Sequence, residues 1–149
     1  MQIKKGTKLA ITIEKVLFPN IGIARIGDQE IRIKNTIPGQ KVELIINKKK
    51  TGYFEARLLE ILENSPLEDQ PKCIHANECG GCSYQGILYE KQLEIKEKQV
   101  KELIDDNLKG DYQFHGIVPS PLEKEYRNKM EFSFGDLERD GVLQLGMHP

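Results

Sequence analysis

The chain has 149 residues, of which 22 are basic, 23 are acidic and 38% are hydrophobic. This composition is typical of a globular protein and argues against a disordered or membrane-embedded one. No apolar run approaches the roughly 20 residues that span a bilayer, and the start at Met1–Lys5 lacks the apolar core of a signal peptide. We therefore expect a cytoplasmic protein without a membrane partner.

The near-neutral net charge hides an uneven distribution along the chain. Residues 1–64 contain twelve basic and seven acidic side chains, whereas the remainder contains ten basic and sixteen acidic ones. A positive first half suggests a polyanionic partner for that half. A solvated surface without any partner explains the same charges equally well.

The first 64 residues alternate apolar and polar side chains over short stretches that are separated by turns. A period of two is typical of half-buried strands. The predicted strands are Thr7–Val16, Ile21–Ile26, Glu30–Lys34, Val42–Ile46 and Tyr53–Leu62. Because the connections leave no room for helices, this pattern favours a five-stranded OB-like β-barrel.

A second lobe follows a polar segment with two prolines, which we interpret as a linker. The predicted domains are a barrel at residues 1–63, a linker at 64–72 and a lobe at 73–149. Apolar residues at helical spacing predict one long helix within Tyr84–Asn107. A strand at Tyr112–Val118 and a hairpin of Met130–Phe134 with Val142–Met147 are also predicted. The fold class is therefore α+β, with two small lobes and part of an antiparallel sheet.

Three cysteines gather within ten residues, at Cys73, Cys79 and Cys82. In a reducing compartment this grouping favours a metal site over disulfides. The two glycines between Cys79 and Cys82 allow a tight turn that directs both sulfurs to one point. An iron–sulfur cluster takes four thiolates and would lack one here. Zinc would accept the three cysteines with His75, and three inert thiols are a further possibility.

Basic and aromatic side chains mark two candidate nucleic-acid surfaces. The barrel offers cations together with the rings of Phe18 and Tyr53, a combination that binds single strands in OB folds. The segment Tyr126–Phe134 places the cations Arg127 and Lys129 beside aromatic rings. The spacing slightly favours the alternative that Phe132 and Phe134 belong to a core and both cations face solvent. The candidate RNA-binding residues are Arg25, Lys48, Lys49, Lys50, Arg57, Tyr126, Arg127 and Lys129.

The sequence contains no phosphate-binding glycine motif and no recognisable set of catalytic residues. There is no G-x-G-x-x-G after a strand and no P-loop. His115 lies in a predicted strand, and His148 is next to the end of the chain, so neither is assigned a catalytic role. These patterns therefore single out neither catalytic residues nor an organic-cofactor site.

Taken together, three groups of motifs resemble the RNA uracil-5-methyltransferases of the TrmA/RumA type, which carry an N-terminal TRAM domain. One group is similar to the TRAM pattern, one to the family's cluster motif and one to the start of its central domain. The matching segments are, in that order, Ile21–Arg25 with Ile37–Val42, then Cys73–Cys82, then Ser120–Pro121 with Tyr126–Phe132 and Leu145–His148.

The resemblance implies methyl transfer from S-adenosylmethionine to carbon 5 of a uridine in ribosomal or transfer RNA, of which ribosomal RNA is the favoured substrate. It implies that Cys73, Cys79 and Cys82 are three of four ligands of a 4Fe-4S cluster. The nucleophilic cysteine, the general base and the S-adenosylmethionine domain of the family lie further along a family member. We therefore expect a fragment that ends early, at Pro149, with RNA as its partner, no protein partner and no activity of its own.

A different class of protein fits the same residues. The chain could be a stand-alone RNA-binding module with a zinc knuckle formed by Cys73, His75, Cys79 and Cys82. Metal content separates these hypotheses, because zinc without iron favours the knuckle. A structural protein with reduced thiols would bind neither metal nor RNA.

Overall fold

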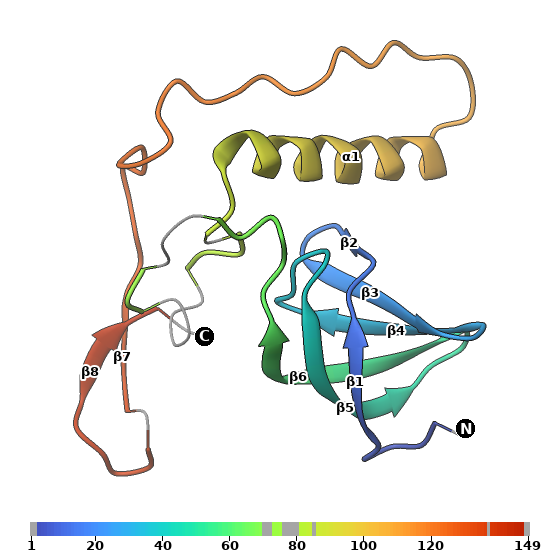
Figure 1. The fold of residues 1–149 in the computed structure, drawn as a ribbon. Helices are drawn as coiled ribbons and strands as arrows, with labels where there is room; N and C mark the ends of the chain where they lie inside the picture. Colours follow the sequence, from blue (N-terminus) through green and yellow to red (C-terminus); the bar gives the residue numbers. More distant parts are fainter. Residues whose placement is uncertain (1–2, 70–72, 76–80, 85, 137, 148–149) are drawn as a thin grey trace.

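A computed structural model describes residues 3–69, 73–75, 81–84, 86–136 and 138–147. Strands dominate the first part of the chain, and one long helix follows the cysteine segment (Figure 1). The elements are β1 (Lys8–Thr12), β2 (Lys15–Leu17), β3 (Ile21–Ile26), β4 (Gln29–Lys34), β5 (Lys41–Lys49), β6 (Tyr53–Glu63), α1 (Tyr89–Asn107), β7 (Ser133–Gly135) and β8 (Gln144–Gly146).

The first six strands form one curled sheet in the order β1-β5-β6-β4-β3-β2. Neighbouring strands are antiparallel, except that β4 and β6 run parallel. The two edge strands, β1 and β2, are consecutive in the chain, so the sheet curls until both edges belong to one segment (Figure 1). The prediction of a barrel-like β domain is thus confirmed, but the strand predicted at Thr7–Val16 is two strands.

The break between β1 and β2 lies at Ile13, which is 1% exposed. Its amide donates a hydrogen bond to the carbonyl of Gln40, and its carbonyl accepts one from the amide of Gly39, both at 2.8 Å. The next residue, Glu14, donates its amide to the carbonyl of Ile23 at 2.8 Å. These hydrogen bonds hold the bend at which the chain leaves one edge strand, β1, and enters the other, β2. A local alternation pattern does not reveal this bend, because the bonding partners are distant in sequence.

The interior of the curled sheet is a continuous aliphatic core. On β4, Ile31 and Ile33 are buried, while Arg32 and Lys34 face outward, as a period of two requires. The buried members of this core are Ile3, Ile13, Val16, Ala24, Ile31, Ile33, Val42, Leu44, Ile46 and Phe54. The outer face of the sheet is therefore free to carry charge.

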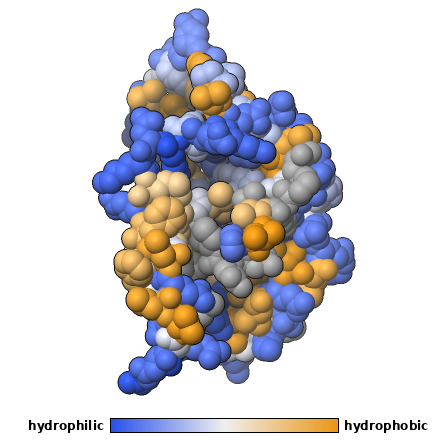
Figure 2. All heavy atoms as spheres, turned by 90° about the vertical axis from the view of Figure 1, so that its left-hand side faces the viewer, coloured by the Kyte–Doolittle hydropathy of each residue, from blue (hydrophilic) through white to orange (hydrophobic). Residues whose placement is uncertain are grey.

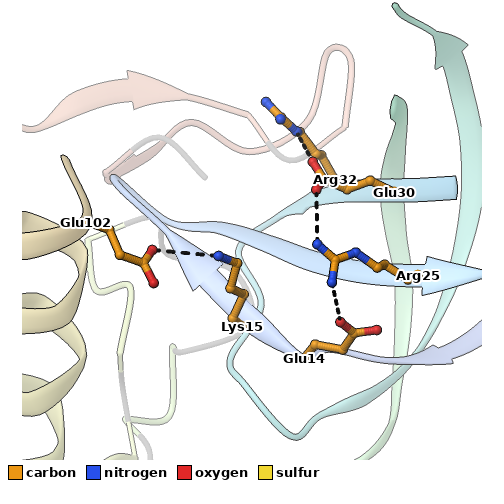
Figure 3. Close-up of polar contacts among 6 residues, drawn as sticks. All are labelled: Glu14, Lys15, Arg25, Glu30, Arg32 and Glu102. Carbon is orange, nitrogen blue, oxygen red and sulfur yellow. Dashed lines mark hydrogen bonds and ion pairs between the residues drawn. The ribbon is translucent and has the colours of Figure 1, made fainter. Parts of the chain in front are cut away.

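Helix α1 packs against the β2 edge of the sheet through a buried amide. Gln99 is 4% exposed, and its Nε2 donates to the carbonyl of Val16 at 3.2 Å and to the Tyr84 hydroxyl at 2.9 Å. An ion pair between Lys15 and Glu102, at 3.8 Å, joins β2 and α1 beside it (Figure 3). Val100, in contrast, is 43% exposed. The helix is confirmed, although it begins at Tyr89 and its apolar spacing does not define its buried face.

The described chain beyond α1 is largely exposed. The predicted hairpin is confirmed in shortened form, because β7 pairs with β8. The strand predicted at Tyr112–Val118 is wrong: this segment is extended beside α1 without strand pairing among the described residues (Figure 1). Its neighbour Ser120 donates its amide to the Tyr89 hydroxyl at 2.7 Å. No described helix is both long and apolar enough to cross a bilayer.

Several large apolar side chains on this last part of the chain face outward. Figure 2 shows hydrophobic surface on the side of the molecule where β7 and β8 lie. The most exposed of these residues are Val118, Phe134, Val142, Leu143 and Leu145. An apolar surface of this kind is uncommon on soluble monomers and marks an interaction region or an aggregation liability.

Gly22 on β3 offers a test of the packing inside the sheet. A Cβ at this position would lie 1.9 Å from Thr36 Oγ1 and 3.2 Å from Ile13 Cγ2. We expect Gly22→Ala to lower the free energy of unfolding by about 1–3 kcal/mol, measured by urea denaturation, because Thr36 is fully buried and cannot move aside. Adding Thr36→Ala should restore part of the loss. Gly135→Ala, where the new Cβ meets nothing within 4 Å, is the control, and equal effects at both glycines would contradict the packing.

Gln99 tests how the helix is held. We expect Gln99→Leu to lower the free energy of unfolding by about 1–3 kcal/mol, because the Val16 carbonyl loses a buried donor. Lys96→Leu, at an exposed position of the same helix, controls for the change in side chain and should shift stability by no more than about 0.5 kcal/mol. A Gln99→Leu variant as stable as Lys96→Leu would show that the buried amide does not hold α1.

Candidate nucleic-acid interface and cysteine loop

The outer face of β4, β6 and β5 is hollowed into a groove of about 680 Å³. Four cations line this groove, together with the ring of Tyr53 and the carboxylate of Glu55. The cations are Arg32, Lys34, Lys48 and Arg57. The excess of positive charge in a concave surface is what a polyanion needs.

Strand register brings these cations together from three segments. Arg32 on β4 lies beside Glu55 on the parallel strand β6, and Lys48 on β5 lies beside the same Glu55. The alternation of β6 then places Arg57 on the same outward face as Glu55. The groove therefore depends on the parallel β4–β6 pair, which joins segments far apart in the sequence.

Two carboxylates near the groove are already paired with cations. Lys50 Nζ lies 3.8 Å from Glu55 Oε1. Glu30 accepts a hydrogen bond from Arg32 Nε at 2.8 Å and lies 3.9 Å from Arg25 (Figure 3). The four cations that line the groove outnumber these two carboxylates, so the groove keeps a net positive charge.

Two of the RNA-binding residues predicted on the barrel, Lys48 and Arg57, line the groove. Lys50 is paired with Glu55 beside it, and the Lys49 ammonium lies 5.9 Å from the centre of the Phe54 ring. Arg25 does not line the groove and instead lies 3.6 Å from Glu14, as Figure 3 shows. The assignment of these five residues to RNA stays a prediction.

The second predicted group, Tyr126, Arg127 and Lys129, lies in an exposed segment without a helix or strand. Lys129 Nζ contacts Glu131 Oε1 at 2.7 Å. None of the three lines the groove on the sheet. The structure therefore does not bring the two predicted groups into one site.

Sequence reasoning missed Arg32, Lys34, Asn35 and Asn47, which all line the groove. The signal was present in Glu30–Lys34, where alternation places the charged side chains on one exposed face. What the alternation does not show is which other strand lies beside that face.

Backbone and side-chain contacts close the cysteine segment at its base. Glu68 and Ile87 form an antiparallel bridge, so the chain leaves and returns at one place. Glu68 Oε2 accepts hydrogen bonds from Gln40 Nε2 at 2.9 Å and from the Ser65 amide at 2.8 Å. The base of the cysteine loop, residues 69–86, is thereby attached to the turn before β5.

Tyr84 attaches the same loop to the helix. It is 7% exposed and packs with Ile37 and Ile87 in a second apolar cluster. Burial raises the pKa of the Tyr84 hydroxyl, and the hydrogen bond from Gln99 opposes this rise. The neutral hydroxyl therefore accepts the Gln99 amide, and the loop, the barrel and α1 meet at one buried contact.

Two of the three predicted metal ligands, Cys73 and Cys82, carry free and exposed thiols. The backbone amide of His75 donates to Cys73 Sγ at 3.5 Å. Cys79 lies outside the described residues, and within the described part of the chain no group of three His, Cys, Asp or Glu side chains could hold a metal. Exposed thiols near the two ends of a closed loop are suitable donors for a soft metal. Since Cys79 is not among the described residues, the three-cysteine site stays a prediction.

Comparison with known proteins gives similarity over nearly the whole chain. No family model matches it. It is 45% identical over 149 residues to an uncharacterized RNA methyltransferase of Clostridium tetani and 43% identical over 145 residues to one of Clostridium acetobutylicum. It is 38% identical over 144 residues to one of Caldanaerobacter subterraneus. These alignments cover 97% or more of the chain but 32% of each relative.

The chain thus spans about a third of the length of the curated relatives that it matches. Identities of 38–45% over almost all its residues leave no doubt about common ancestry. The resemblance to the RNA methyltransferase family is therefore confirmed, and the chain is a homologue of a segment of these proteins.

Proposed function

We propose that this chain supplies the RNA-binding and cluster-binding parts of an RNA methyltransferase. The observation that carries the proposal is 45% identity, over 99% of the chain, to a protein named an RNA methyltransferase. The motif resemblance supports the finer proposal that the reaction uses S-adenosylmethionine and modifies carbon 5 of a uridine. Ribosomal RNA is proposed as the substrate in preference to transfer RNA.

The barrel is proposed to be an OB-like TRAM domain. Two features of the sheet support this: β1 and β2 are halves of one bent segment, and β4 pairs in parallel with β6. Counted in this way, the curled sheet has the five strands of an OB barrel. Such barrels bind single strands along a positive groove, and the groove on β4, β6 and β5 is suitable for that role.

The proposed role of this chain in methylation is to bind and position RNA. Pyrimidine C5 is a weak nucleophile that the family activates by adding a cysteine thiolate to the ring. The resemblance matches Cys73, Cys79 and Cys82 to cluster ligands and assigns none of them this role. The 149 residues alone are therefore proposed to bind RNA without methylating it.

Cys73, Cys79 and Cys82 are proposed to hold an iron–sulfur cluster. When bound, the cluster would supply a rigid cross-link within the loop, since methyl transfer consumes no electron. The chain's own contribution is the closed base at Glu68 and Ile87 and the anchor at Tyr84. Both connect the loop to the sheet that carries the groove, so a rigid loop would fix the geometry of a larger RNA surface.

A zinc knuckle is the second candidate for the same loop. The hydrogen bond from the His75 amide to Cys73 Sγ shows that these two residues lie close together. A Cys3His set would complete a tetrahedral zinc site without any further ligand. The chain would then be an RNA-binding module.

Salt-dependent RNA binding tests the groove. We expect the double variant Lys48→Ala/Arg57→Ala to bind a labelled single-stranded RNA more weakly than the wild type. The plot of the logarithm of the association constant against the logarithm of the salt concentration should become less steep by about 1.4, which corresponds to two lost phosphate contacts. Fluorescence anisotropy at several salt concentrations measures both quantities. Lys96→Ala/Lys98→Ala on α1 removes the same charge elsewhere. An equal loss in both double variants would show that only net charge matters.

Metal content tests the loop. We expect the chain, reconstituted without oxygen from iron and sulfide in the presence of a small thiol as fourth ligand, to bind iron and sulfide. Cys73→Ala and Cys82→Ala should each abolish the visible absorption, whereas His75→Ala should leave it unchanged. Stoichiometric zinc that is lost in His75→Ala would overturn the cluster in favour of the knuckle.

A further inference from the structure

The guanidinium of Arg32 is held in the groove at two points. Its carbon lies 3.9 Å from the centre of the Tyr53 ring, and its Nε donates to Glu30 Oε1 at 2.8 Å. The side chain nevertheless remains 35% exposed and lines the groove. A long side chain that would otherwise be mobile in solvent is therefore fixed as a flat group on an aromatic ring.

A fixed guanidinium plane has a particular use in RNA recognition. Unpaired bases stack on aromatic rings and on arginine planes, whereas bases inside a duplex are already stacked and paired. Lysine provides the same charge but no plane. An arginine that is supported by a tyrosine can therefore distinguish single strands from duplexes, in addition to attracting phosphate.

The surroundings of Arg32 fit one unpaired nucleotide and its neighbouring phosphates. Lys34, Lys48 and Arg57 line the same groove and offer cations around the guanidinium. The side-chain amides of Asn35 and Asn47 also line it and can donate to or accept from a base edge. The groove volume of about 680 Å³ is in the range of pockets for small molecules. A groove of this size suits one or a few nucleotides of an unpaired strand better than the side of a duplex.

We propose that Arg32, supported by Tyr53, is the stacking platform for one unpaired nucleobase and makes the groove selective for single-stranded RNA. This inference rests on the proposed function, because the class of the ligand comes from it. The platform, however, is carried by the geometry of Arg32, Tyr53 and Glu30. Its consequence is that planarity, and not only charge, sets the affinity for single strands.

The test compares three probes on the 149-residue chain: a short single-stranded oligouridine, an abasic strand of the same length and an RNA duplex. We expect Arg32→Lys to weaken oligouridine binding about tenfold, the size of one lost stacking contact. The abasic strand and the duplex should bind the variant as they bind the wild type, with an unchanged salt slope, because the charge is kept. Tyr53→Leu should reproduce the loss by releasing the guanidinium.

Arg139→Lys is the matched control, since it makes the same change at a position that is far more exposed and does not line the groove. Its binding to all three probes should equal that of the wild type, and thermal melting shows that each variant is folded. Equal weakening of all three probes by Arg32→Lys would overturn the platform and make Arg32 a phosphate contact. Wild-type affinity for oligouridine in Arg32→Lys would also overturn it. A wild-type chain that binds none of the probes would instead overturn the proposed RNA-binding function.

Discussion

The bend at Ile13 is the constraint on which the arrangement of the sheet depends. Its backbone is bonded on both sides to Gly39 and Gln40, so the first segment of the chain can pair with β5 before the bend and with β3 after it. The two edges of the sheet thereby become neighbours, and the aliphatic side chains gather inside. Burial of these side chains is the main source of stability for so small a domain.

The turn that contains Gly39 and Gln40 also connects the barrel to the cysteine loop. Gln40 bonds to Ile13 through its backbone and to Glu68 through its side chain, and Glu68 in turn bridges to Ile87. On the other side of the loop, Tyr84 meets Gln99 of the helix. The sheet, the loop and α1 are therefore joined by a few polar contacts that are buried or half-buried. Those of Gln99 are the costliest to break, because their groups have left water.

Local sequence patterns predicted most of the strands and the helix, but not which segments pack or pair with one another. Alternation found the strands and helical spacing found the helix, because each depends on residues close in sequence. The bend at Ile13 and the burial of Gln99 depend on backbone groups that are distant in the chain. The residues Tyr112–Val118 alternate as a strand would, but they pair with no other strand among the described residues, so the predicted strand does not form. In the candidate site, the outward direction of Arg32 was readable from alternation, whereas its stacking on Tyr53 required the register of β4 and β6.

The position of the sheet within the chain has a consequence for synthesis. All six strands of the curled sheet lie between Lys8 and Glu63, so the hydrogen bonds between these strands involve no later residue. Domains generally fold as units during translation, starting from the N-terminus. On the ribosome, the barrel can therefore be complete before the cysteines emerge. The loop and helix would then assemble on a preformed surface, which offers the carbonyl of Val16 to Gln99 and the side chain of Gln40 to Glu68.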